Sequence, residues 1–181
     1  MMKYILVLFL VISGVFANNI DTNIVAKYKK DFRNLSSKQL DLAKEIAYKA
    51  KAYGLSLEAV AIAWQESNLG EYPINLQDPS CGPFHININT YVNRYNIKKT
   101  GFHKNRACSM LVNDIDLSVS AFIAEYEAWK VSHNKRGNIS SEFILRSYNA
   151  GYNYNSEQAK VYAKHVLARM KAIEELIDEL Q

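Results

Sequence analysis

The sequence predicts a single, mainly α-helical domain, and three observations support this prediction. Only 3 Pro and 7 Gly interrupt 181 residues, which leaves room for long helices. Apolar residues recur at helical spacing along most of the chain. No segment shows a convincing alternation of apolar and polar residues, which would indicate a strand. With 49% hydrophobic residues, the composition is that of a globular protein with a sizeable core.

The N-terminal residues 1–17 have the pattern of a secretory signal peptide. Lys3 gives a positive start and an apolar stretch follows, and Val15 and Ala17 are small enough for the two positions that a signal peptidase reads. We therefore expect cleavage after Ala17 and a periplasmic or secreted protein. An uncleaved N-terminal anchor is the competing interpretation.

The mature domain is expected over residues 18–181, with its core at about 36–180. No later segment is apolar enough to cross a bilayer, so we expect no stable membrane span after cleavage. An even pair of cysteines in an oxidising compartment can form a disulfide. Cys81 and Cys108 are that pair, although two buried free thiols would also fit the sequence.

Charge and histidine spacing argue against two classes of protein. The formal net charge is +4, and the basic residues are scattered apart from residues 27–33. No basic stripe interleaved with aromatic residues indicates a nucleic-acid partner. Ligand-like spacing is also missing among the four histidines, so neither a metal nor another cofactor is expected.

The elements were placed from their caps and apolar spacing. The first helix is expected to begin at Ser36 or Ser37 and to end at Gly54. Ser56 is expected to cap the next helix, which runs to about Ser67. The remaining expected elements are loops and short turns over 71–110, a helix from 113 or 114 to about 132, a polar connection over 133–138, a short helix from 140 or 141 to about 148, a loop over 149–155, and a long final helix capped by Ser156.

Glu66 is the sharpest candidate for a catalytic residue. It lies near the end of a helix in which every residue from Ala59 to Trp64 is apolar, and a helix that is apolar all round is normally buried. Partial burial disfavours the charged form of a carboxyl group. A carboxylic acid that is still protonated near neutral pH can protonate a glycosidic oxygen. By itself, a glutamate at a helix end is more often a solvated polar residue.

Two further segments change this balance. Residues 80–86, Ser-Cys-Gly-Pro-Phe-His-Ile, form a turn that returns Phe84 and Ile86 to the core soon after Glu66. Residues 147–151, Ser-Tyr-Asn-Ala-Gly, end a helix, and the glycine permits a tight turn beside a ligand. Each segment alone would be read as an ordinary loop or helix end.

Together, and in this order, the segments resemble the soluble lytic transglycosylases. That family shows Glu-Ser at the end of its catalytic helix, then Ser-x-Gly-Leu-(Met/Phe)-Gln-Ile, Asn-Ile-x-x-Gly, Tyr-Asn-Ala-Gly and a last helix with Tyr-x-x-x-Val. The matching positions are Glu66-Ser67, then Ser80, Gly82, Phe84 and Ile86, the looser Asp114-Ile115-x-x-Ser118, Tyr148-Asn149-Ala150-Gly151, and Tyr162-x-x-x-Val166. The resemblance covers roughly residues 40–170.

The resemblance implies a lysozyme-like α domain with a loop-rich insert after the catalytic helix. It also implies an activity: Glu66 protonates the bond between N-acetylmuramic acid and N-acetylglucosamine, then accepts the proton of the C6 hydroxyl as a 1,6-anhydro end forms. One carboxylate suffices for this reaction. The implied partners are peptidoglycan glycan strands. The implied substrate-binding residues are Ser67, Phe84, His85, Tyr148 and Asn149.

Two departures from the family pattern and three alternatives stay open. Pro83 replaces the usual Leu, and His85 replaces Gln. A hydrolytic muramidase would need a second carboxylate to hold water, and Glu71 and Asp78 are the nearby candidates. A glycan-binding protein of the same fold without catalysis is the alternative from another class, although it would not need Glu66. The biological setting is also open among wall turnover, a secretion or conjugation apparatus, and phage lysis.

Overall fold

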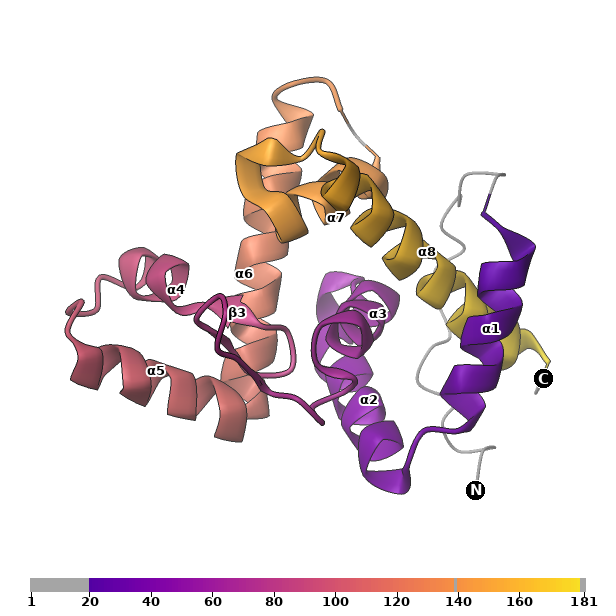
Figure 1. Cartoon of the computed structure of the whole chain (residues 1–181), viewed down its shortest axis with the longest axis horizontal. Coiled ribbons are helices and arrows are strands. Elements are labelled where there is room, and N and C mark those ends of the chain that lie inside the picture. The colour runs from indigo at the N-terminus through magenta and orange to yellow at the C-terminus, as the bar shows by residue number, and fades with distance from the viewer. Residues whose placement is uncertain (1–19, 139, 180–181) are drawn as a thin grey trace. The chain divides into compact units, whose positions relative to one another are not determined.

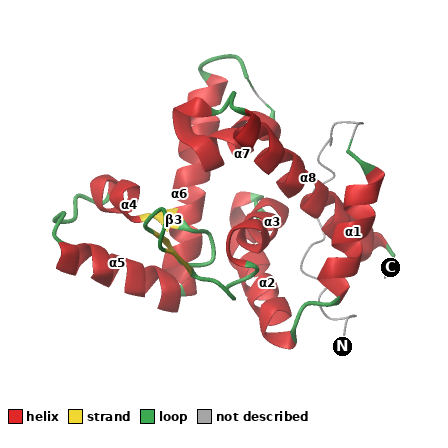
Figure 2. Cartoon of the chain, viewed as in Figure 1, coloured by secondary structure: helices red, strands yellow, loops and turns green. Residues whose placement is uncertain are grey.

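The computed structural model describes residues 20–138 and 140–179, so the expected signal peptide lies outside the described residues. Within this part of the chain the protein is mainly α, with eight α-helices, 73% helical content and a small three-stranded antiparallel sheet (Figure 2). This confirms the predicted class. The α-helices are α1 (Thr22–Arg33), α2 (Ser37–Ala50), α3 (Ser56–Ser67), α4 (Ile88–Arg94), α5 (Gly101–Asn113), α6 (Ile115–Asn134), α7 (Ser141–Ala150) and α8 (Glu157–Asp178).

The chain divides into two compact units. Figure 1 labels the helices and colours the chain from indigo at the N-terminus to yellow at the C-terminus. The central unit comprises residues 37–123. The terminal unit comprises residues 20–36 together with the described residues from 124 onward. Helix α6 begins in the central unit and ends in the terminal unit.

Helices α2 and α3 pack against each other in the central unit. Helix α2 presents one apolar stripe to this contact, formed by Ala43, Ile46, Ala47 and Ala50. Helix α3 is buried on all sides, since every residue from Ala59 to Trp64 is at most 5% exposed. The prediction from its continuous apolar sequence is therefore confirmed.

The ends of these two helices agree with the sequence at one point and differ at another. A short 3-10 helix (Lys51–Tyr53) follows α2, and Gly54 ends it in the left-handed conformation, as predicted. Ser56, however, does not cap α3. Leu55 occupies the N-cap position, and the Ser56 hydroxyl donates a hydrogen bond to the Ala47 carbonyl at 2.9 Å. Its side chain thus joins α3 to α2 instead of closing the helix end.

The segment 71–110 contains more regular structure than the sequence predicts. Three two-residue strands, β1 (Ile74–Asn75), β2 (Ser80–Cys81) and β3 (Ile86–Asn87), form an antiparallel sheet in the order β1-β2-β3. Helices α4 and α5 follow and pack against each other. Strands of two residues are too short to show alternation. Helix α5 buries only Ala107 and Leu111, so its apolar stripe is weak.

The terminal unit is built from helices. Helix α8 packs against α7 and against α1. Helix α1 precedes the expected core and has no counterpart in the sequence prediction. Its Tyr28 hydroxyl lies 2.7 Å from Nδ1 of His165, and Lys29 forms an ion pair with Glu175 at 3.1 Å. Ser156 accepts a hydrogen bond from the backbone N–H of Ala159, which confirms the predicted cap of α8.

No single helix among the described residues is long and apolar enough to cross a membrane. Helices α5 and α6 satisfy the criterion only when taken together, and the chain bends by 104° between them.

Candidate active site

Glu66 is the second-to-last residue of α3. The preceding turns of this helix are buried in the central unit, while the Glu66 side chain keeps 18% of its surface exposed. The carboxyl group therefore lies at the point where a rigid, buried helix reaches the surface. Such a support holds a reacting group more firmly than a loop would.

The backbone after Glu66 reverses sharply and caps the helix. Asn68 and Leu69 both have positive φ values, 51° and 54°, and Gly70 follows at 77°. The N–H of Asn68 donates to the carbonyls of the last helical turn, and Leu69 is buried. Left-handed backbone costs non-glycine residues about 1 kcal/mol each. The burial of Leu69 offsets that cost and fixes where the helix stops.

Ser67 connects α3 to the segment 80–86. It is fully buried, and its Oγ lies 2.8 Å from the Pro83 carbonyl, to which it donates. The same oxygen accepts the N–H of Gly70 at 2.8 Å. The resemblance implied that Ser67 contacts substrate. Its burial and its two bonds give it a supporting position beside Glu66 instead.

The segment 80–86 is anchored by its apolar residues. Phe84 and Ile86 return to the core, as predicted. Phe84 is fully buried, and its ring stacks on that of Phe122 with 4.6 Å between centroids. Phe84 was also expected to bind substrate, but its ring faces the interior and holds the loop in place.

Gly82 lets this segment pass close to another part of the central unit. Its φ is +80°, and an added Cβ would lie 2.6 Å from the Leu111 carbonyl oxygen and 2.7 Å from Oγ of Ser118. Ser118 is itself buried and donates to the same carbonyl at 2.5 Å. Both the backbone conformation and the space therefore require glycine here.

His85 lies between the two buried anchors and points to the opposite side. Its φ is +45°, and its N–H donates to the Gly82 carbonyl at 3.1 Å. The imidazole Nε2 lies 2.8 Å from the Tyr72 carbonyl, and Nδ1 lies 3.4 Å from Oε2 of Glu66. The ring is 11% exposed. The tight turn thus brings His85 directly against the Glu66 carboxyl group.

The surroundings of His85 favour its charged form. Burial lowers its pKa, but the hydrogen bond to Glu66, the Tyr72 carbonyl and the charge of Asp78 act in the opposite direction. Together they leave the pKa of His85 above its ordinary value of 6.5. The contact with Glu66 thus favours the protonated form of the imidazole more than free solvent does.

The two other carboxylates near this loop already have partners. Glu71 accepts a hydrogen bond from the side-chain amide of Asn68. Asp78 accepts one from the Asn87 amide at 2.9 Å. Both side chains are on exposed residues. Each is tied to an asparagine of its own loop.

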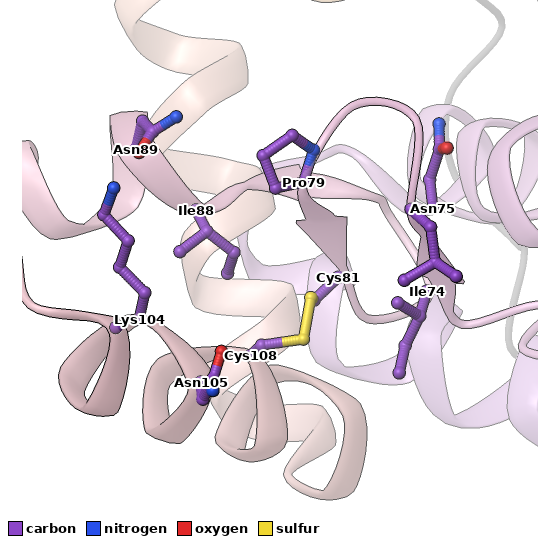
Figure 3. A pocket seen from close by; sticks show the side chains of 11 residues that line it. Ile74, Asn75, Pro79, Cys81, Ile88, Asn89, Lys104, Asn105 and Cys108 are labelled. Atoms are coloured by element: carbon purple, nitrogen blue, oxygen red, sulfur yellow. A yellow bond between two sulfur atoms is a disulfide. The ribbon is translucent and has the colours of Figure 1, made fainter.

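A disulfide and a pocket lie elsewhere in the central unit. Cys81 in β2 is bonded to Cys108 in α5 with 5.3 Å between their Cα atoms, so the pairing that the sequence left open is present. Figure 3 shows the pocket beside this bond, with a volume of about 280 Å³. Its lining includes Ile74, Ile88 and Lys104 beside the two cysteines, and none of the predicted catalytic or substrate-binding residues lines it.

Tyr148 and Asn149 belong to the terminal unit. Both lie in the last turn of α7. The sequence predicts that Asn149 begins a loop, and this prediction is wrong because the helix continues to Ala150. Tyr148 is half-buried and Asn149 is exposed. Gly151 then has a φ of 58° and a ψ of −128°, which confirms the tight turn at this position.

The residue before Tyr148 takes part in a buried pair that the sequence analysis did not anticipate. The Ser147 hydroxyl lies 2.8 Å from Nε2 of His133, and both residues are buried. The rings of Phe143 and Tyr154 pack against the imidazole. Burial, with a smaller effect of the Arg136 charge, lowers the pKa of His133. No local pattern in the sequence indicates this contact, because the two residues lie on different helices.

Among the described residues, no group of three or more His, Cys, Asp or Glu side chains could hold a metal ion. Comparison of the chain with protein-family models, with curated proteins and with solved structures finds no match.

Proposed function

We propose that this chain is a peptidoglycan lytic transglycosylase with a lysozyme-like fold and with Glu66 as its acid/base catalyst. The observation that carries the proposal is the setting of Glu66. Its carboxyl group follows the buried stretch from Ala59 to Trp64, is partly exposed, and contacts the imidazole of His85. The chain order of Glu66, the 80–86 turn and Tyr148-Asn149 is the order in the family that the sequence resembles.

The proposed reaction uses Glu66 twice. The protonated carboxyl group donates its proton to the oxygen between N-acetylmuramic acid and N-acetylglucosamine, and that bond breaks. The resulting carboxylate then accepts the proton of the muramic C6 hydroxyl, whose oxygen closes on C1 to give a 1,6-anhydro end. The proton count balances over the cycle, and no protein nucleophile is needed. Tyr148 and Asn149 remain proposed substrate contacts.

The hydrolytic alternative requires a second carboxylate that holds a water molecule on the opposite face of the sugar. Glu71 and Asp78 were its candidates, and each is hydrogen-bonded to an asparagine side chain. A carboxylate bonded to one amide still has further acceptor sites, so the released ends and the Glu71 and Asp78 variants distinguish the two reactions. A glycan-binding role without catalysis would leave the Glu66–His85 contact without a purpose.

The proposed location is outside the cytoplasm, where peptidoglycan is found. The Cys81–Cys108 bond gives this weak support, since disulfides persist mainly in oxidising compartments. A secretion or conjugation apparatus stays a proposed partner, because a small exported domain is compatible with that setting.

The test is mass spectrometry of muropeptides released from purified sacculi. The wild type should release 1,6-anhydro ends, whereas reducing ends would identify a hydrolase. Glu66→Gln preserves the shape of the side chain but cannot donate and accept the proton, so activity should fall by about 10²–10⁴-fold. Glu71→Gln and Asp78→Asn are matched controls and should keep most activity. Near-normal release by Glu66→Gln, with an unchanged circular dichroism spectrum, would show that the proposed site is wrong.

A further inference from the structure

The two nitrogens of the His85 ring face groups of different chemistry. Nε2 lies 2.8 Å from the Tyr72 carbonyl oxygen, and a carbonyl can only accept a hydrogen bond. Nε2 must therefore carry a hydrogen. In the neutral imidazole this leaves Nδ1 as a lone pair, and Nδ1 is the atom that faces Oε2 of Glu66 at 3.4 Å.

The two side chains can form a hydrogen bond with each other only when one proton lies between them. A lone pair on Nδ1 against an ionised carboxylate would place two acceptors in contact. With one proton, either the carboxylic acid donates to Nδ1 or the imidazolium donates to the carboxylate, and both states form a hydrogen bond.

We infer that Glu66 and His85 hold one proton between them, which makes His85 a positioning residue that keeps a proton within reach of Glu66. The catalytic consequence rests on the proposed function. The shared proton itself is a property of the central unit that can be measured without any activity.

The surroundings of the ring support this assignment. Two carboxylates act on it: Glu66 from α3 by contact, and Asp78 from the turn before β2 through its charge. The backbone holds the ring in place, since His85 is in the left-handed region and its N–H is bonded to Gly82. The resulting pKa of His85 lies above its ordinary value despite partial burial. A glutamine, usual at this position in the resembling family, would make the contact without titrating.

The first experiment follows the His85 ring by NMR as pH is varied. In Glu66→Gln the shared proton has no carboxylate partner, while the burial of the ring remains, so the pKa of His85 should fall below that of the wild type. Glu71→Gln is the matched control, because Glu71 lies in the same loop but is not among the groups that act on His85. An unchanged His85 titration in Glu66→Gln would overturn the inference.

The second experiment measures the pH profile of muropeptide release. In His85→Gln, the fall of activity on the alkaline side of the profile should begin at a lower pH. Above that pH, activity should be tenfold lower for each pH unit of the shift. Asparagine adopts positive φ more readily than glutamine, so His85→Asn repeats the pH-profile measurement in case glutamine disturbs the turn. His103→Gln, elsewhere in the central unit, should leave the profile unchanged.

The outcomes separate the two proposals. An alkaline fall of activity that does not move in either His85 variant would overturn the role of His85 while leaving Glu66 as the catalyst. A wild type that shows the coupled His85 titration but releases no muropeptide at any pH would overturn the proposed function and leave the shared proton intact.

Discussion

The central and terminal units hold their polar groups in place by different means. The four non-glycine residues with positive φ among the described residues all belong to the central unit: Asn68, Leu69, His85 and Asn96. Asn68 and Leu69 follow Glu66 within three residues, and His85 contacts it. The described part of the terminal unit has positive φ only at Gly137 and Gly151, and its side chains are positioned by ordinary helix packing. Backbone strain thus collects at the candidate site.

One histidine from each unit makes the difference concrete. His85 in the central unit contacts a carboxylate, and its pKa is raised. His133 in the terminal unit contacts the Ser147 hydroxyl among aromatic rings, and its pKa is lowered. Each ring is at least largely buried. Burial lowers the pKa of both rings, and only His85 has a carboxylate contact that reverses the direction of the shift.

The largest expected effect is on the disulfide of the central unit. Cys81 and Cys108 are separated by 27 positions, and a closed loop of this size stabilises by about 3.5 kcal/mol in the chain-entropy model. We expect the double variant Cys81→Ser/Cys108→Ser to lose about this much free energy of unfolding, measured by urea denaturation. Reductant should destabilise the wild type similarly and leave the double variant unaffected. A loss below about 1 kcal/mol would mean that the central unit does not depend on this bond.

The next effect compares one glycine from each unit. Gly82→Ala should cost about 3 kcal/mol, because positive φ adds about 1–2 kcal/mol and the Cβ would press against the Leu111 carbonyl oxygen at 2.6 Å. Gly137 in the terminal unit has a similar φ of +75° with no atom within 4 Å of an added Cβ. Gly137→Ala should therefore cost only the backbone term, about 1–2 kcal/mol. Equal losses in thermal or urea unfolding would contradict the close approach at Gly82.

The smallest effect concerns the pH dependence of stability. The pKa of His133 is lower in the folded protein than in the unfolded chain, so the unfolded state binds more protons as pH falls below about 6.5. His133 should therefore cost stability on acidification, by at most about 1.4 kcal/mol per pH unit. The Arg136 charge acts in the same direction. His85 acts in the opposite sense: its raised pKa adds stability below about 6.5, which is lost as pH rises through the folded value.

The measurement is the urea midpoint of the wild type and His133→Gln between pH 8 and pH 5. The wild type should lose stability more steeply over this range. His165, whose pKa is also lowered, is present in both proteins and cancels in the comparison. Parallel curves would show that His133 does not differ in protonation between the folded and unfolded states.

Prediction from sequence succeeded where the signal is local. The apolar residues from Ala59 to Trp64 predicted a buried helix, and Gly54 and Ser156 marked helix ends that the structure confirms. The same local reasoning failed at Ser56, whose hydroxyl found a partner in the neighbouring helix. It failed also at α5, where two buried residues gave too weak an apolar stripe.

The candidate site likewise has features that the local sequence determines and features that depend on contacts between segments. The sequence by itself determined that Glu66 ends a buried helix and that Phe84 and Ile86 bring their segment back to the core. Only the tertiary structure decided that His85 faces the Glu66 carboxyl group. The Tyr72 carbonyl that orients the ring is a backbone atom, and every residue has one, so no residue type announces it. Contacts between segments depend on the path of the loop, and that path is set by packing and left-handed backbone rather than by local propensity.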